Sequence, residues 1–476
     1  MNLPDGIVAF VKADCPTCVL VDPVLGELET AGVLTAVFSQ DDPTFPASVP
    51  VVINDTSLEM SWHHDIETVP TLIKVSEGAE TQRVVGWSRN QWIEFTGIPG
   101  LGEGITEFSP GCGSLSVDPD RVSELEAKFG DGFASRHVEF AAAEDPIEAM
   151  YDRGWSDGLP LVPPTPERVA RMLTGTTRHR TERVAIVPPD LAECSVEKVA
   201  VNAVMAGCRP EYLPVVIAAL EAACTDEFNI HGLLATTMAS GPVLIVNGPI
   251  RHAIGMNSGV NVLGQGNRAN STIGRALQLV IRNVGGGIPG GVDRATHGNP
   301  GKLGFCFAED EEGSPWTSLA VSRGFSADAS TVTLFPGEGP RLVFDQLTRT
   351  ADGLAKSLAL ALLANNHPRQ VQRHDAVLVV SPEHAARFHD AGWTREQTTE
   401  AIIAATTQRV ADISRGLDGI GEGPPDTVAG PEVTKFRPDG LHLVHAGGKA
   451  GLFSAVIAGW VGGAVGSQMV TKEITP

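Results

Sequence analysis

Apolar runs separated by turn residues divide the first hundred positions into short, closely spaced elements. Strands are predicted over 6–12 and 33–39, and 71–87 predicts two strands joined by a Glu-Gly turn. Helices are predicted over 15–32, 58–66 and 88–97. In the first of these helices the expected core-facing side chains are Val19, Val21, Leu25 and Leu28. The predicted order of elements is βαβαββα.

Apolar strands also alternate with helices in the rest of the chain, with no internal repeat. The pattern predicts helices over 122–130, 145–154, 195–207, 213–224 and 394–416, and strands over 242–250, 374–383 and 440–448. Residues 97–124 are rich in Gly, Pro, Ser and acidic residues, which is typical of a linker. The predicted organisation is an α/β domain at 1–100, an extended segment at 101–140 and a larger mixed α/β domain at 141–476.

Charge and cysteine content narrow the classes of function. The chain has 476 residues and a net charge of −22, so nucleic-acid backbones repel it and we expect no nucleic-acid partner. Its seven cysteines include only one closely spaced pair, which does not resemble a secreted disulfide framework. The first residues lack the pattern of a signal peptide, so we expect a cytoplasmic protein.

One uncharged segment bears on the expectation of a cytoplasmic protein, because it has the length of a membrane span. Residues 450–470 carry no charge and are long enough to span a bilayer. Five of them are glycine, Ser467 and Gln468 interrupt the far end, and no basic cluster flanks them. The pattern favours a buried strand–loop–strand, so no membrane partner is expected.

The stretch 13-ADCPTCVLVDP-23 places two thiols at the start of a predicted helix. A helix N-terminus stabilises a thiolate and lowers its pKa, and a second thiol one turn later can resolve a mixed disulfide. The neighbouring carboxylate of Asp14 is expected to act in the opposite direction, raising the pKa of Cys15 and reducing its reactivity. A zinc pair is disfavoured because no second CxxC or His pair accompanies this one.

Three features in this order resemble the thioredoxin-like family over residues 1 to 100. They are the CPTC motif directly after the first strand, Pro23 within the helix, and ETVPTLIKV (67–75) with Pro70 in the position of a cis-proline. The resemblance implies that Cys15 attacks, that Cys18 resolves, and that the two form a redox-active Cys15–Cys18 disulfide; a metal cofactor has no support from the ligand spacing. It also implies that Pro70 lies against the pair and blocks metal binding there.

The family resemblance implies an external reductant, such as a thioredoxin reductase system, as a partner. Two departures qualify it. Ala9 stands where the family has a buried acid, and Pro16-Thr17 stands between the cysteines where general thioredoxins have Gly-Pro. A dedicated electron donor is therefore favoured over a general one. The alternative is a domain that has kept the fold only for docking or for dimerisation, which is compatible with a homo-oligomer.

The large domain contains six segments that are unusually dense in polar residues, at 153–165, 205–214, 228–237, 247–276, 285–316 and 445–455. Their combination resembles a bacterial family of unassigned chemistry, which implies one functional unit and nothing about the substrate. Arginine pairs with carboxylate or phosphate, and glycine lets backbone N–H groups approach a ligand. The candidate substrate-binding residues are His231, Asn257, Arg268, Asn270, Arg294, His297 and Lys302.

Other interpretations of these segments stay open. Residues 293–302 are equally compatible with a solvated loop, and the acidic run 309–313 with a metal or base cluster or a solvated turn. Nucleotide binding is disfavoured because GQGNRA does not lie cleanly between a strand and a helix, and HAGGKAG lacks the GK[ST] ending. A metal site built from His231, His252, His297 and Cys208 lacks the usual ligand spacing.

Two further cysteines are candidates for redox chemistry. Cys112 lies in PGCGS, where it could act as a third redox thiol between domains or be an incidental loop residue. Cys208 is a candidate reaction centre because the adjacent Arg209 should lower its pKa, with a buried core cysteine as the alternative. Cys194, Cys224 and Cys306 lie in apolar stretches and are expected in the core.

Together these observations favour an enzyme of the thiol–disulfide oxidoreductase type. The first domain would pass electrons or sulfur to a reaction centre in the large domain, which acts on a small polar or anionic substrate. Fusion of the two domains raises the effective concentration of the donor. The main alternative is a metal- or acid/base-dependent lyase or hydrolase whose first domain is structural. A non-enzymatic folding factor is the third hypothesis.

Overall fold

The computed structural model describes residues 2–130, 132–141, 143–365, 370–413, 430–460 and 466–475. The chain is mixed α/β and forms two compact units. The first comprises Met1–Phe133 and Pro166–Ala170, and the second comprises Ala134–Thr165 and Arg171–Pro476. Most of the segment expected to be a linker therefore belongs to the first unit.

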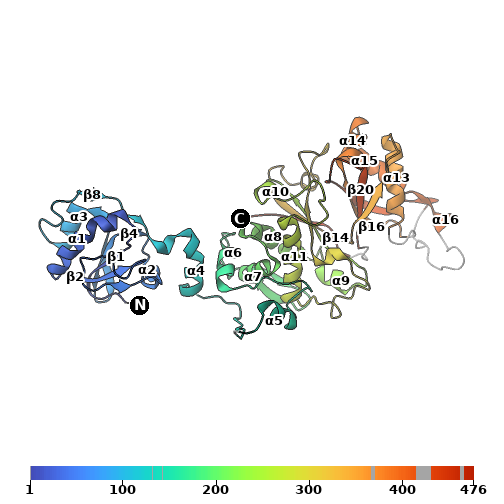
Figure 1. Ribbon diagram of the computed structural model, residues 1–476. Coiled ribbons are helices and arrows are strands. Elements are labelled where there is room, and N and C mark those ends of the chain that lie inside the picture. The colour runs from blue at the N-terminus through green and yellow to red at the C-terminus, as the bar shows by residue number, and fades with distance from the viewer. Residues whose placement is uncertain are drawn as a thin grey trace. The chain divides into compact units, whose positions relative to one another are not determined.

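A five-stranded mixed sheet forms the centre of the first unit, in the order β3-β2-β1-β5-β6. Its strands are β1 (Gly6–Val11), β2 (Leu34–Ser39), β3 (Ile53–Asn54), β5 (Thr71–Ser76) and β6 (Ala79–Val85). The helices are α1 (Pro16–Thr30), α2 (Glu59–His63) and α3 (Arg89–Thr96). Figure 1 labels β1 and β2 of this sheet together with helices α1, α2 and α3. β1 pairs in parallel with β2 and antiparallel with β5. The predicted βαβαββα order is confirmed, with short strands added.

Helix α1 presents three of its four expected core residues to the sheet. Val21, Leu25 and Leu28 are fully buried, whereas Val19 is 54% exposed, so the expectation for Val19 is wrong. Two residues correspond to about 200° around a helix, so Val19 and Val21 cannot share one face. Pro23 lies inside the helix, as the family resemblance implied.

Residues 101–130 fold back along the first unit instead of forming a free linker. β8 (Phe108–Ser109) pairs with β7 (Trp87–Ser88), and β9 (Cys112–Gly113) pairs with β4 (Thr68–Val69). A 3₁₀ turn, η1 (Leu115–Val117), and helix α4 (Pro119–Phe129) follow. The ring of Phe129 lies 5.8 Å from that of His63 in α2. This return of the chain is what carries Cys112 to the sheet.

The second unit contains two four-stranded sheets. The first has the order β13-β12-β14-β21, built from β13 (Phe305–Ala308), β12 (Gly241–Asn247), β14 (Thr331–Gly337) and β21 (Val470–Glu473). The second has the order β15-β20-β16-β19, built from β15 (Arg341–Phe344), β20 (Phe453–Ala458), β16 (His374–Val380) and β19 (Phe436–His445).

The two sheets pack face to face, and each is covered by helices on its other side (Figure 1). Alternation along β16 shows the layering. Val377 and Val379 pack with Phe307 and Phe335 of the first sheet, whereas Leu378 packs with the helical layer. The first sheet is covered by α8 (Leu213–Ala223) and α11 (Arg268–Asn283), against which α7 (Val196–Ala206) packs. The second is covered by α13 (Ala351–Leu363), α14 (Pro382–Asp390) and α15 (Arg395–Ala405).

Shorter elements complete the chain. They are α5 (Pro146–Asp152), α6 (Pro166–Leu173), β10 (Arg183–Val187), β11 (Ala192–Ser195), η2 (Pro210–Tyr212), α9 (Ile230–Ala235), α10 (Ile250–Ala253), η3 (Pro300–Leu303), α12 (Leu319–Ser322), β17 (Gln408–Arg409), α16 (Val410–Ile413) and β18 (Glu432–Val433). The predicted strands in the large domain are confirmed. Of the predicted helices, 394–416 is shorter than expected, because it breaks at β17, and residues 414–416 lie outside the described residues.

The uncharged segment 450–470 is not a helix where the structure describes it. It supplies β20, and β21 begins at its last residue, while residues 461–465 lie outside the described part. In the described residues, no helix combines the length and the apolar character needed to cross a bilayer.

Helix α13 allows a matched test of the layered core. Leu358 is fully buried beside Trp316, whereas Leu360 on the same helix is 69% exposed. We expect Leu358→Ala to destabilise the second unit by about 2–5 kcal/mol, and Leu360→Ala to cost below about 0.5 kcal/mol. Urea unfolding followed by tryptophan fluorescence measures both. Equal losses for the two variants would contradict the placement of α13.

Candidate functional site

Cys15 occupies the N-cap position of α1. Its backbone is extended, with φ −142°, and Pro16 begins the helix. The sulfur of Cys15 accepts the backbone N–H of Cys18 at 3.4 Å. This N–H is one of the donors that the first turn of a helix leaves without a backbone acceptor. The CPTC sequence thus aims unpaired donors at the first of its two sulfurs.

Two further contacts surround this sulfur. The Sγ atom of Cys112 lies 2.8 Å from the Sγ atom of Cys15, and the carbonyl oxygen of Val69 lies 3.6 Å from it. The Val69–Pro70 peptide bond is cis, as the family resemblance implied. Cys15 and Cys18 are buried, and Cys112 is partly exposed. All seven cysteines are free thiols, and three of them form one cluster.

Hydrogen bonds to the Cys15 sulfur outweigh the cost of its burial. The hydrogen bond from the Cys18 thiol makes the largest contribution, and burial acts against it. The Cys112 thiol and the backbone N–H groups of Cys18 and Thr17 add further hydrogen bonds. The net effect lowers the pKa of Cys15 to about 5. Burial raises the pKa of Cys18 far above its ordinary value and also raises that of Cys112. Cys15 is therefore the thiolate of the cluster at neutral pH.

The expectation that Asp14 would raise the pKa of Cys15 is wrong. The pKa of Cys15 is lowered, and Asp14 is not among the causes. The Asp14 side chain is exposed, where water screens its charge. Its backbone N–H and that of Ala13 donate to the carboxylate of Asp41, at 2.8 and 2.7 Å.

The candidate substrate-binding residues of the second unit do not form a single site. Asn257 and Asn270 bond each other, since the backbone N–H of Asn257 donates to Asn270 Oδ1 at 3.1 Å and Asn270 Nδ2 donates to the Asn257 carbonyl at 2.9 Å. Arg268 donates to the carbonyl of Gly207 at 2.9 Å, and Lys302 pairs with Asp293 at 2.7 Å. The remaining three, His231, Arg294 and His297, are exposed.

Three of the polar segments meet around a cavity of about 140 Å³ in the second unit. Its lining includes Asn270, Ser271, Arg275 and Cys306. Arg275 is held by Asp157 through two bonds of 2.7 and 2.8 Å. Burial opposes ionisation of Asp157, but Arg275 keeps its pKa below the ordinary value. The sequence interpretation omitted Asp157 as an anchor, although SDG lies within the polar segment 153–165.

Cys208 does not have the electrostatic environment expected from its neighbour Arg209. The residue is 6% exposed, and its sulfur donates to the carbonyl of Thr272 at 3.4 Å. Burial raises its pKa to about 12, although Arg268 and Arg275 act in the opposite direction. The expectation of a lowered pKa is therefore wrong. Cys194 and Cys306 are buried as expected, and Cys224 is partly exposed.

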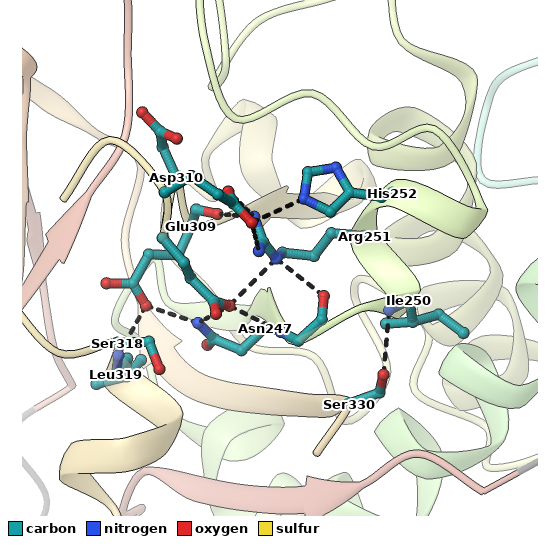
Figure 2. Close-up of polar contacts among 12 residues, drawn as sticks. Asn247, Ile250, Arg251, His252, Glu309, Asp310, Ser318, Leu319 and Ser330 are labelled. Carbon is teal, nitrogen blue, oxygen red and sulfur yellow. Dashed lines mark hydrogen bonds and ion pairs between the residues drawn. The ribbon is translucent and has the colours of Figure 1, made fainter. Parts of the chain in front are cut away.

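The acidic run 309–313 begins inside the protein, which the sequence interpretation missed. Figure 2 shows Glu309, which follows β13 and is fully buried. Its carboxylate accepts the side-chain amide of Asn247 and the backbone N–H of Leu319, each at 2.7 Å, and Arg395 at 3.4 Å. Burial raises the pKa of Glu309, and the charge of Arg395 opposes that effect.

Arg251 joins the rest of this acidic run to α10 (Figure 2). It is 3% exposed and donates to the Glu309 carbonyl at 2.7 Å and to Glu312 at 2.9 Å. His252 also contacts Glu312, at 2.9 Å. Within the described ranges, no three His, Cys, Asp or Glu side chains are grouped so as to hold a metal ion. The run is an ion-pair network that begins at the buried Glu309 and reaches the surface at Glu312, and the strand end followed by EDEEG was its only sequence signal.

Comparisons with family models, with curated proteins and with solved structures find no match for this chain. The site must therefore be judged from its own geometry. The three-cysteine cluster of the first unit is the strongest candidate, because it combines a low-pKa thiol with two further sulfurs.

The buried Arg395–Glu309 pair permits a test against an exposed pair of the same chemistry. Arg395→Met removes the charge that faces a buried carboxylate, so we expect a loss of about 3–5 kcal/mol at neutral pH. Arg409→Met, at an exposed pair with Asp412, should cost far less, because water screens that pair.

The loss at Arg395→Met should depend on pH. The folded-state pKa of Glu309 is already raised, so its contribution to stability falls as pH rises through that pKa. Removal of Arg395 raises the pKa further. Denaturant unfolding in acidic and alkaline buffers should therefore show the larger loss in the alkaline one. A pH-independent loss would mean that Glu309 stays neutral in the folded protein.

Proposed function

We propose that the first unit catalyses thiol–disulfide exchange, with Cys15 as the attacking thiolate and Cys18 as the resolving thiol. The observation that carries the proposal is the opposite direction of the two pKa shifts. The pKa of Cys15 is lowered to about 5, whereas that of Cys18, one helical turn away, is raised. An attacking sulfur must be ionised at rest, and a resolving sulfur must not compete with it.

The exchange reduces a substrate disulfide in two steps. The Cys15 thiolate attacks one sulfur of a substrate disulfide, the substrate bond breaks, and one substrate thiolate leaves. Cys18 then attacks the Cys15 sulfur, and its proton goes to the second substrate thiolate. The substrate gains two electrons, and the protein retains a Cys15–Cys18 disulfide. An external dithiol, such as a thioredoxin reductase system, returns the protein to its reduced form.

The resemblance to thioredoxin-like proteins supports this proposal through the CPTC motif, Pro23 and the cis peptide bond before Pro70. We propose further that the second unit uses the electrons, or sulfur, in a reaction on a small polar or anionic molecule. The cavity beside Asn270 and Arg275 is the candidate place for that molecule. Cys208 is a weak candidate for the acceptor at rest, because burial raises its pKa to about 12.

A matched pair of cysteine variants tests the exchange activity. The reduced full-length chain is mixed with glutathione disulfide at about pH 5.5, where an ordinary thiol is ionised in roughly one molecule in a thousand. A low pKa also weakens the nucleophile, so the net advantage of Cys15 is smaller than its ionisation suggests. We expect Cys15→Ser to oxidise at least about tenfold more slowly than the parent.

Cys224→Ser is the control for this experiment, because Cys224 lies in the second unit and burial raises its pKa to about 12. It should oxidise at the parental rate, as measured by loss of free thiols in acid-quenched samples. Equal rates for Cys15→Ser and the parent would sink the proposal. That outcome would favour the alternative of a lyase or hydrolase whose first domain is structural.

A further inference from the structure

A segment of the first unit lies over Cys15, in the place that an incoming disulfide would need. This covering segment comprises residues 108–114. In the ladder between β9 and β4, Cys112 stands opposite Val69 and Gly113 opposite Thr68. The backbone N–H of Ser114 extends the pairing by donating to the Glu67 carbonyl at 2.9 Å. The ladder therefore fixes Cys112 opposite Val69, the residue before Pro70, and beside Cys15.

Glycine permits the close approach of the covering segment. A Cβ atom on Gly111 would lie 2.3 Å from Thr68 Cγ2 and 3.0 Å from the Val69 carbonyl oxygen. A Cβ atom on Gly86 would lie 2.8 Å from the Gly111 nitrogen. Any larger residue at 111 would push the segment, and Cys112 with it, away from the CPTC motif.

Side chains hold the covering segment at both sides of the cluster. Thr17 lies between the two cysteines, directly after Pro16. Its hydroxyl oxygen forms a hydrogen bond of 2.8 Å with Ser109 Oγ and donates to the Pro110 carbonyl at 2.5 Å. Lys12 donates to the Gly113 carbonyl at 2.8 Å. Beyond the cluster, Gln40 donates to Ser114 Oγ at 2.6 Å. Thr17 belongs to α1, Lys12 follows β1 and Gln40 follows β2, so the contacts come from three separate elements of the first unit.

The covering segment keeps solvent away from the sulfur of Cys15. Cys15 is 1% exposed, whereas Cys112 is partly exposed. A disulfide bond is about 2.05 Å long, so the sulfurs of Cys15 and Cys112, at 2.8 Å, need to approach by only roughly 0.8 Å to bond. No substrate disulfide can come as close while the segment is in place.

We propose that Cys112 is a built-in exchange partner of Cys15, so that the covering segment acts as an internal substrate of the CPTC motif. The inference rests on the proposed exchange activity and adds a third catalytic thiol. The first unit then cycles between two disulfides, Cys15–Cys112 with the segment locked over the site, and Cys15–Cys18 with Cys112 released.

Both steps balance with a small disulfide as the oxidant. In the first, the Cys15–Cys112 bond forms, the bond of the oxidant breaks, and two electrons pass to its sulfurs. The proton of Cys112 goes to one of the two thiolates released. In the second, Cys18 attacks the Cys15 sulfur, the Cys15–Cys112 bond breaks, and the proton of Cys18 goes to Cys112.

The covering role of the segment is tested at Thr17. Thr17→Val keeps the shape of the side chain and removes both bonds to the covering segment. We expect Cys15 to react with iodoacetamide roughly tenfold faster, because loss of two hydrogen bonds favours the open segment. Thr30→Val is the matched control, since Thr30 is on the same helix and bonds only the Gly26 carbonyl. An unchanged rate in Thr17→Val would show that the segment does not limit access.

The role of Cys112 as a third catalytic thiol is tested by trapping its disulfide with Cys15. Full-length Cys18→Ser is equilibrated with millimolar glutathione disulfide, blocked with N-ethylmaleimide and digested with trypsin without reductant. Cys15 falls in the tryptic peptide 13–74 and Cys112 in 90–121, and neither contains another cysteine in this variant. We expect the linked peptides to exceed the glutathione adduct of Cys15 by at least about tenfold, because the two sulfurs are held together.

The outcomes separate the two proposals. Glutathione on Cys15 together with blocked, free Cys112 would overturn the role of Cys112 and leave the exchange activity intact. Cys15 that stays unmodified would overturn both. Cys18→Ser combined with Cys112→Ser is the control, and there Cys15 should carry glutathione.

Discussion

The hydrogen bond from the backbone N–H of Cys18 to the sulfur of Cys15 ties the chemistry of the first unit to the start of α1. The bond exists because Pro16 begins the helix and leaves Cys15 as its cap. The helix keeps its direction because Val21, Leu25 and Leu28 are buried against the sheet. Every other feature of the cluster, including the approach of Val69 and Cys112 from the opposite side, is built around a sulfur already fixed in this way.

Burial alone does not decide which cysteine has a lowered pKa. Cys15, Cys18 and Cys208 are all buried, and desolvation opposes ionisation in each of them. Only Cys15 has several donors directed at its sulfur, and only its pKa is lowered. The number of hydrogen-bond donors, more than exposure or a neighbouring arginine, decides which cysteine carries charge.

The second unit uses the same principle to hold charge inside a four-layer core. Glu309 is tolerated at the end of β13 because Asn247, Leu319 and Arg395 supply donors to its carboxylate. Many of the polar residues that suggested a binding site form hydrogen bonds or ion pairs with other residues of the protein. The Asn257–Asn270 and Asp293–Lys302 contacts stabilise loops, whereas the cavity beside Arg275 is the place where three of the polar segments meet.

The sequence by itself determined the features that depend on near neighbours. Alternation of apolar residues predicted the βαβαββα order, and the CPTC spacing placed Cys15 and Cys18 one turn apart at a helix start. Only the tertiary structure decided that Cys112, 97 residues along the chain, lies against Cys15, that Glu309 is buried, and that Asp14 does not oppose the fall in the pKa of Cys15. Periodicity and helix capping are local effects, whereas burial and donors from distant strands exist only once the chain has folded.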